Sequence, residues 1–135
     1  MAKKPAPDVS RIATENFATT LGIELVSATI DHVVVKMPYD QKFGIGRIHG
    51  GAISALIDVA ATAAFWSTSE VNQNSNGATV GFTVNFLKLA VKSDLWAEAT
   101  IRRRGGTLCT ANVVVTNDRQ DEIAIAVVTY KLTHD

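Results

Sequence analysis

A glycine-bearing tripeptide in the middle of the chain has the residue types needed to bind a negative charge. His49-Gly50-Gly51 follows a loop that carries Gly44 and Gly46, and it opens a helical stretch. Glycines at a helix start let another group approach the backbone N–H groups closely, and the helix dipole adds positive charge behind them. Such a tripeptide can hold an anion or a developing oxyanion. A glycine-rich helix start with a surface histidine explains the same three residues without chemistry.

Asp58 is the second residue that could act chemically. It is the only charged residue between His49 and Trp66, and its neighbours are apolar. A lone carboxylate in such a helix is costly unless it lines a cavity or has a partner. The structural alternative is a hydrogen bond with Thr62, one turn further on. A buried acid with no evident structural partner is more often functional, which makes Asp58 a candidate catalytic base or nucleophile.

The spacing between His49 and Asp58 limits how they could work together. Nine residues of helix turn through roughly two and a half turns and rise about 13 Å. The two side chains therefore point to opposite sides of the helix. If both act on one substrate, the site must combine the helix start of one subunit with Asp58 of another, which predicts a dimer.

The spacing of the apolar residues predicts the helices and strands that must position these residues. Ser10–Leu21 has helical spacing, with Ser10 and Gly22 as cap signals. Ile23–Met37 is rich in β-branched residues and reads as one long bent strand or as two strands joined near Asp31. Residues 38–47 form a loop, and a helix that is apolar on every face runs from residue 48 or 49 to about Thr68.

Four further strands are expected after this helix. In the first, Val80, Phe82, Val84 and Phe86 alternate with Thr79, Gly81, Thr83 and Asn85; the other three cover about 95–102, 108–116 and 122–132. Their short turn-type connections suit antiparallel pairs. A helix that is apolar all round must be covered all round, so we expect an α+β fold in which a curved antiparallel sheet wraps one long central helix and a second subunit covers the remainder.

Composition sets broader limits. The chain has 135 residues, 47% of them hydrophobic, which suits one globular domain over residues 10–135 after a flexible tail at 1–9. Its formal net charge of zero argues against nucleic acid or an acidic membrane as partner. One cysteine and three scattered histidines argue against a disulfide and against a metal site. The apolar stretch 50–66 is short for a membrane span and carries Asp58, and the N-terminus lacks the apolar core of a signal peptide, so a cytoplasmic location is expected.

The segment from Gly46 to Asp58 resembles the signature of the 4-hydroxybenzoyl-CoA thioesterase superfamily, in particular its phenylacetate-pathway (PaaI-like) branch. The resemblance continues through Val80–Leu87 and covers most of residues 20–133. It implies a hotdog fold and hydrolysis of a small or medium acyl-CoA thioester, aromatic ones included. It also implies a homodimer or homotetramer, and no cofactor besides the coenzyme A of the substrate.

The resemblance assigns roles to individual residues. Asp58 corresponds to the catalytic carboxylate, Gly50 to the backbone donor for the carbonyl oxygen, and His49 to the residue that orients this oxygen. Thr79 stands where relatives often have a serine or threonine that positions water or the carboxylate, although an ordinary strand threonine would look the same. Gly51 and Thr62 are expected to contact substrate.

Two further sets of substrate-binding candidates follow from the resemblance. Relatives often have an asparagine where this chain has Phe43, and Gln41 could supply an amide instead. Arg103, Arg104 and Lys88 are candidates for the phosphates of coenzyme A, although charges at a hairpin tip are more often simply solvated. Apolar pocket residues near the subunit interface are expected to be Phe43, Phe65, Trp66 and Phe82.

The replacement at Phe43 also supports a rival interpretation, a non-catalytic hotdog protein that binds acyl-CoA or another ligand. A DNA-binding regulator is disfavoured because the chain has no net positive charge and no helix-turn-helix segment.

Overall fold

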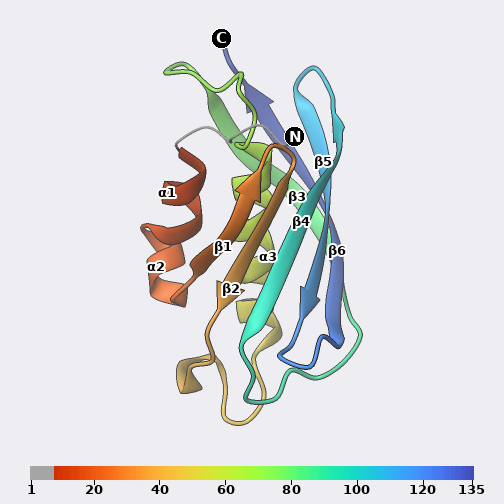
Figure 1. Cartoon of the computed structure of the whole chain (residues 1–135). Coiled ribbons are helices and arrows are strands. Elements are labelled where there is room, and N and C mark those ends of the chain that lie inside the picture. Colours follow the sequence, from red (N-terminus) through yellow and green to blue (C-terminus); the bar gives the residue numbers. More distant parts are fainter. Residues whose placement is uncertain (1–7) are drawn as a thin grey trace.

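The computed structural model describes residues 8–135 and shows a curved sheet curled around a central helix. Figure 1 shows the sheet on one side of α3 and the two short helices α1 and α2 on the other. The elements are α1 (Asp8–Thr14), α2 (Phe17–Leu21), β1 (Glu24–Thr29), β2 (His32–Met37), the 3₁₀ turn η1 (Gln41–Phe43), α3 (Gly50–Phe65), β3 (Asn76–Phe86), β4 (Leu95–Arg104), β5 (Leu108–Thr116) and β6 (Glu122–Thr133). This arrangement confirms the predicted α+β hotdog architecture.

The sheet has six strands in the order β1-β2-β4-β5-β6-β3, and every pair is antiparallel. β1 and β3 are therefore the two edge strands. The inward-facing residues of the middle strands, such as Val35, Ala97 and Val113, are fully buried against α3. The region after the central helix forms four strands, as the alternation predicts.

Helix α3 is buried because small residues line it. Ala60, Ala61, Ala63 and Ala64 have no exposed surface, and neither does Phe65. Alanines let the strands approach the helix backbone closely, and alanine is also the residue that favours helix most. The sixteen-residue helix runs without a break, so the half-turn offset between its start and Asp58 holds in the structure.

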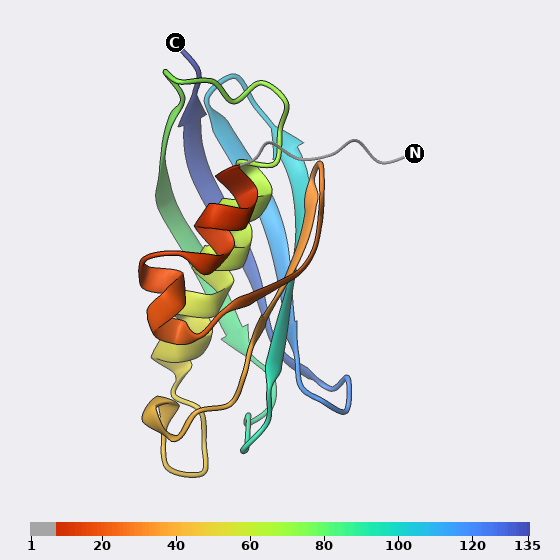
Figure 2. The ribbon, with the colours of Figure 1, turned by 60° about the vertical axis from the view of Figure 1, so that its left-hand side comes forward.

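The N-terminal segment differs from the single predicted helix over 10–21. It forms two helices because the chain turns sharply at Asn16, whose φ is 56°. Figure 2 shows α1 and α2 lying across the outer face of α3. The predicted tail at 1–9 lies mostly outside the described residues, and α1 already begins at Asp8.

Residues 23–37 form two strands rather than one bent strand. β1 and β2 are joined by a tight turn in which Asp31 has a φ of 71°. The Asp31 N–H donates to the hydroxyl of Ser67, just past the end of α3. The hairpin turn is thereby fixed to the end of the central helix.

Strand β3 departs from the regular alternation that its sequence suggests. Thr79 lies opposite Tyr130 and Gly81 lies opposite Thr129, so Val80 is an extra residue in a β-bulge. Beyond the bulge Phe82 lies opposite the fully buried Val128. The bulge brings Thr79 onto the same, helix-facing side of the sheet as Phe82, although strict alternation would put the two on opposite sides.

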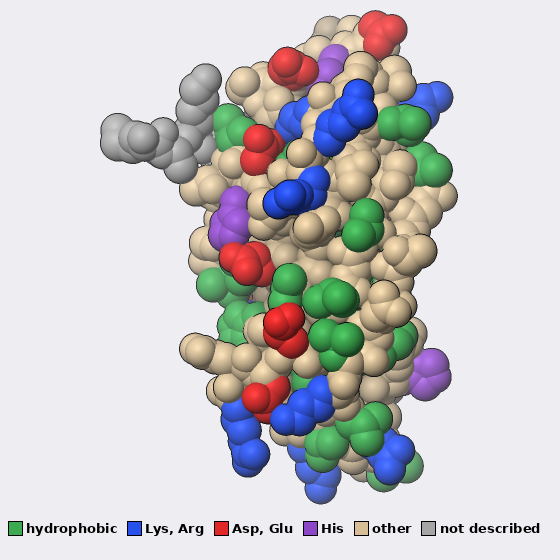
Figure 3. Space-filling view, turned by 90° about the vertical axis from the view of Figure 1, so that its right-hand side faces the viewer, with side chains coloured by type: hydrophobic (Ala, Val, Ile, Leu, Met, Phe, Trp, Pro, Cys, Tyr) green, Lys and Arg blue, Asp and Glu red, His purple; other side chains and the backbone are tan. Residues whose placement is uncertain are grey.

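The face of the sheet seen in Figure 3 carries acidic and basic side chains interspersed along its length, with hydrophobic side chains gathered toward its lower half. Within residues 8–135, no helix is long and apolar enough to cross a membrane. The same residues bring no three His, Cys, Asp or Glu side chains together in the way that a metal ion needs.

Candidate active site

His49 caps the start of α3. Its extended backbone, with φ −61° and ψ 137°, brings the ring Nδ1 within 2.8 Å of the Gly51 N–H, from which it accepts a hydrogen bond. A neutral imidazole that accepts at Nδ1 carries its proton at Nε2. The side chain is exposed, so this Nε2–H is available to donate to a bound group.

The loop before His49 is held in place by Phe43. The Phe43 side chain is 7% exposed, and its carbonyl accepts a hydrogen bond of 2.7 Å from the His49 N–H. Gly44 follows with a φ of 142°, where any side chain would collide with the carbonyl of Arg47. Phe43 therefore anchors the loop in the core, and Gln41 lies exposed in the 3₁₀ turn before it.

The Gly50 N–H is the open donor at this helix start. Among the hydrogen bonds of the described residues, none is donated by Gly50 N–H, whereas the Gly51 N–H is engaged by His49. The tip of the Phe86 ring lies next to Gly50, 3.2 Å from the place that a Cβ would occupy. The Gly50 N–H, which the resemblance implies as the donor for the carbonyl oxygen, therefore has no partner among the described residues, whereas the Gly51 N–H holds the histidine ring.

Asp58 has a partner, but it is Thr79 rather than Thr62. The Thr79 hydroxyl donates a hydrogen bond of 2.7 Å to Asp58 Oδ1. The β3 bulge makes this contact because it turns Thr79 toward α3. One carboxylate oxygen is thereby fixed, and Oδ2 is left to act on another group.

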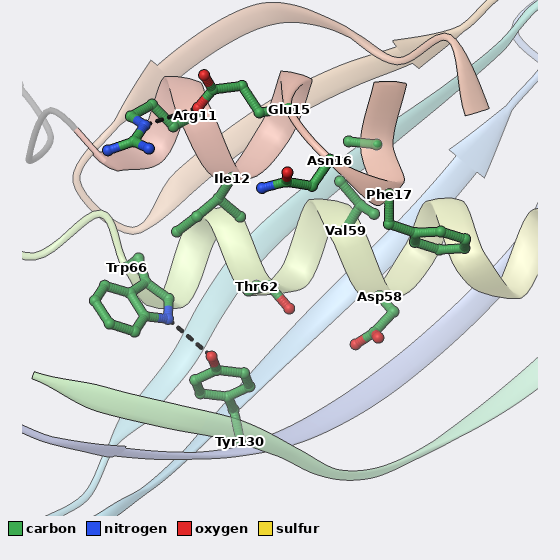
Figure 4. A pocket seen from close by; sticks show the side chains of 11 residues that line it. Arg11, Ile12, Glu15, Asn16, Phe17, Asp58, Val59, Thr62, Trp66 and Tyr130 are labelled. Atoms are coloured by element: carbon green, nitrogen blue, oxygen red, sulfur yellow. Dashed lines mark hydrogen bonds and ion pairs between the residues drawn. The ribbon is translucent and has the colours of Figure 1, made fainter. Parts of the chain in front are cut away.

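Asp58 lines a pocket of about 490 Å³ between α3, the N-terminal helices and β6. Figure 4 shows the arrangement, with Asp58 and Thr62 pointing from α3 toward Tyr130. The opposite wall comes from α1 and α2 and includes the apolar residues Ile12, Phe17 and Ala18. Of the four predicted pocket residues, only Trp66 lines this space, because Phe43 and Phe65 are buried in the core and Phe82 lies outside it.

Within one chain, the two halves of the predicted site remain apart. Neither His49 nor Gly50 lines the pocket of Asp58. Asp58 lies near the middle of α3, about two turns beyond the helix start at Gly50. The chain therefore presents a positioned carboxylate in a pocket and, separately, an open oxyanion donor at a helix N-terminus.

These features agree with comparisons to known proteins. Residues 45–124 match the family model described as "Thioesterase superfamily", which spans both halves of the site. The chain belongs to the thioesterase superfamily. It is 30% identical over 106 residues to acyl-coenzyme A thioesterase 13 from Homo sapiens, covering 76% of this chain and 74% of that protein. The chain spans about two thirds to three quarters of the length of the curated relatives that it matches.

Solved structures of other thioesterases share the fold. A thioesterase family protein from Silicibacter pomeroyi superimposes with a TM-score of 0.82 at 26% identity, covering 95% of this chain and 98% of the other. The PaaI protein from the phenylacetic acid degradation operon of E. coli gives a TM-score of 0.78 at 23% identity, with coverages of 93% and 96%. The predicted thioesterase superfamily membership is confirmed.

The basic residues proposed for coenzyme A have different surroundings in the structure. Arg104 donates to Asp31 at 2.8 Å and to the carbonyls of Phe65 and Ala64 at 3.0 and 3.1 Å, so its guanidinium closes the C-terminal end of α3. Lys88 is exposed and forms a 2.7 Å ion pair with Asp121, which lowers the pKa of that carboxyl. Arg103 is exposed on β4.

Tyr130 also lines the Asp58 pocket, and it is not among the residues predicted from the sequence. Its hydroxyl accepts a 2.8 Å hydrogen bond from Trp66 Nε1, and its ring stacks on Phe65 with centroids 4.8 Å apart. Burial raises the pKa of Tyr130, with a smaller contribution in the same direction from Asp58, while the Trp66 hydrogen bond acts in the opposite sense. The sequence feature that could have indicated Tyr130 is that it is the only aromatic residue in β6.

Proposed function

We propose that this protein hydrolyses acyl-CoA thioesters at a site shared between two subunits. One subunit supplies Asp58 with Thr79, and the other supplies the Gly50 N–H with His49. The contact between Thr79 and Asp58 beside an open pocket carries the proposal, because it prepares a carboxylate for chemistry rather than for packing. A cytoplasmic location, and no cofactor apart from the coenzyme A of the substrate, belong to the same proposal.

The chemistry requires one base and one oxyanion site. Asp58 Oδ2 takes a proton from water, and the resulting hydroxide adds to the thioester carbonyl carbon. The negative charge that develops on the carbonyl oxygen is bound by the Gly50 N–H and the positive end of α3, with His49 Nε2–H as a second donor. Collapse of the tetrahedral intermediate breaks the carbon–sulfur bond, and the coenzyme A thiolate leaves and is protonated. In the alternative, Asp58 Oδ2 itself adds to the carbonyl carbon and the coenzyme A thiolate leaves; water then hydrolyses the resulting acyl-aspartate anhydride, which releases the free acid and restores Asp58.

The edge strand β3 supports the shared site. One edge of this strand has no partner strand among residues 8–135, and the strand exposes apolar side chains at Val80, Phe82 and Phe86. An open apolar edge is a surface that proteins usually cover. A second copy of the chain could add its own β3 here and continue the sheet across a twofold axis.

Twofold pairing of β3 would bring the two halves of the site together. Thr79, near one end of the strand, contacts Asp58, whereas Phe86, at the other end, lies over Gly50. Antiparallel pairing places the Thr79 end of one strand beside the Phe86 end of its partner. The Gly50 N–H of one subunit then approaches the Asp58 pocket of the other. A dimer is therefore the smallest active unit that we propose, alone or as half of a tetramer.

The surroundings of Phe43 favour a second candidate function, binding of an acyl-CoA without hydrolysis. A phenylalanine side chain offers no polar group to the carbonyl oxygen, and here it is buried in the core. Gln41 lies exposed in the 3₁₀ turn, and no hydrogen bond of the described residues holds its amide in place. Arg103 and Lys88 remain candidates for the phosphates of coenzyme A in either case, since both are exposed.

Replacement of Asp58 by asparagine tests the proposed hydrolysis. Asparagine can still accept the Thr79 hydrogen bond, but it cannot act as base or nucleophile. We expect kcat/KM for a panel of acyl-CoA thioesters to fall by about a thousandfold. Release of free thiol measures the reaction, and the melting temperature of the variant checks its fold. Asp118→Asn, at an exposed site, is the matched control. Wild-type rates in Asp58→Asn would contradict the proposal, and binding without hydrolysis by the wild type would favour the second candidate.

A further inference from the structure

The far end of the Asp58 pocket carries a hydrogen-bond donor for which the described residues supply no acceptor. Asp58 and Thr62 of α3 and Trp66, the residue just after the helix, lie four residues apart, so they follow one face over about 12 Å. At the Trp66 end stands the Tyr130 hydroxyl. Its oxygen accepts from Trp66, and among the described residues no acceptor is found for its own proton.

Tyr130 is held rigidly in this position. Its ring stacks on Phe65 at an interplanar angle of 13°, and its oxygen is bound by the Trp66 indole. On the neighbouring strand β3, Gly77 lies opposite Leu132, diagonally beside Tyr130, and leaves the space that the ring occupies, because a Cβ there would come within 2.5 Å of the Tyr130 ring. A hydroxyl fixed on three sides cannot turn away from whatever enters the pocket.

The lining of the pocket is therefore amphipathic. Ile12, Phe17 and Val59 supply apolar surface, whereas the hydroxyls of Thr62 and Tyr130 face the same space from the side of the sheet. The remaining polar lining comes from α1 and the turn after it, at Arg11, Glu15 and Asn16. An alkyl chain that filled the far end would displace water from the Tyr130 hydroxyl and leave its proton unpaired, which is costly. A chain that ends in an oxygen would accept this proton and avoid the cost.

We propose that Tyr130 determines acyl specificity by donating a hydrogen bond to an oxygen at the far end of a medium-length acyl chain. The preferred substrates are then acyl-CoA thioesters with a distal hydroxyl or oxo group. This inference rests on the proposed function, since it takes the Asp58 pocket to be the acyl pocket.

Matched pairs of substrates test the proposal. Hexanoyl-, octanoyl- and decanoyl-CoA are each compared with the analogue in which the terminal methyl is replaced by a hydroxyl of similar size. The quantity measured is the ratio of kcat/KM for the hydroxyl member to that for the methyl member. In the wild type this ratio should peak at one chain length, because Tyr130 is fixed. If the wild-type ratio does not change with acyl chain length, or changes steadily with it, the proposal is overturned before any variant is made.

The variant Tyr130→Phe removes only the hydroxyl. At the peak length we expect it to lower the ratio about tenfold, the loss of one well-placed hydrogen bond. Tyr39→Phe makes the same chemical change at the end of β2, away from the pocket, and should leave the ratio as in the wild type. A ratio that Tyr130→Phe leaves unchanged, while hydrolysis continues, overturns the role of Tyr130.

Failure of the proposed function gives a different result. If the wild type hydrolyses no member of the panel, the same pairs are compared by calorimetric binding. A dissociation-constant ratio that is sensitive to Tyr130→Phe then still supports the specificity role, and an insensitive ratio overturns it.

Discussion

At the scale of single residues, His49 has two tasks that its position at the helix start combines. Its Nδ1 accepts a hydrogen bond from the Gly51 N–H, and this bond leaves the proton of the neutral ring on Nε2. The adjoining Gly50 N–H stays open. In the proposed function these two groups serve as the donors for the oxyanion, and they are free to do so before any substrate arrives.

Replacement of Gly50 by proline tests the backbone donor directly. Proline lacks the N–H but suits the first position of a helix, and the extended backbone of His49 is what a residue before proline prefers. We expect kcat to fall by about a hundredfold or more. Gly50→Ala is the control, because it keeps the N–H and makes the same contact with the movable tip of Phe86. Equal activity of the two variants, measured as thiol release, would rule out Gly50 as the donor.

Residue types revealed part of the candidate site from sequence alone. Gly50 and Gly51 stand out because paired glycines are unusual at the start of a helix, and Asp58 stands out because a lone charge is unusual in the middle of an apolar one. The contact of Thr79 with Asp58 could not be derived from the alternation, since the bulge at Val80 changes which face Thr79 occupies. Tyr130 was missed because its role depends on Trp66, which is 64 residues away along the chain.

At the scale of elements, α3 is held at both ends. At its start, the His49 N–H is bound to the Phe43 carbonyl of the preceding loop. At its end, Arg104 of β4 donates to the carbonyls of Ala64 and Phe65 and pairs with Asp31. Helix ends leave carbonyls without partners, and a guanidinium beside them also complements the helix dipole.

This role of Arg104 gives a prediction for stability. Arg104→Met should lower the free energy of unfolding by about 2 kcal/mol, because it removes hydrogen bonds from a charged donor to the helix end. Arg103→Met, one residue earlier and exposed, should change it by less than about 0.5 kcal/mol. Urea unfolding of both variants checks this. If Arg104→Met were as stable as the wild type, Arg104 would not be what closes the helix.

The elements themselves were largely predictable, because hydrophobic period is a local signal. The central helix and the four strands after it have the expected places. The break at Asn16 was not predicted, since Asn16 takes a left-handed φ that leaves the apolar spacing of residues 12–21 unchanged. The bulge in β3 was not predicted either. Val80 and Phe82 are both apolar, so the sequence keeps a regular alternation although Val80 is an extra residue in the strand.

At the scale of the whole molecule, the two edges of the sheet differ in their surroundings. β1 forms one edge and packs beside α1, whereas β3 forms the other beside the Asp58 pocket. Sequence predicted that a second subunit would be needed, from the half-turn between His49 and Asp58. It could not say which surface that subunit would cover, since strand order depends on pairings between distant segments. The free β3 edge supplies a candidate surface.

A charge at the middle of β3 tests the proposed pairing. In a twofold interface, Phe82→Asp would place two like charges near each other and bury them. We expect the variant to sediment as a smaller species and to lose most of its thioesterase activity. Val26→Asp, on the opposite edge strand and more exposed, is the control and should keep both. An active Phe82→Asp protein of unchanged size would argue against this interface.

The shared site is tested most directly by mixing two inactive variants. Asp58→Asn lacks the base and Gly50→Pro lacks the oxyanion donor, so each homodimer should be nearly inactive. After unfolding and refolding of an equal mixture, half of the dimers should contain one of each chain, and one of the two sites in such a dimer is intact. The account predicts recovery of about one quarter of the wild-type thiol release. A mixture that stays as inactive as its two components would contradict a site built from two subunits.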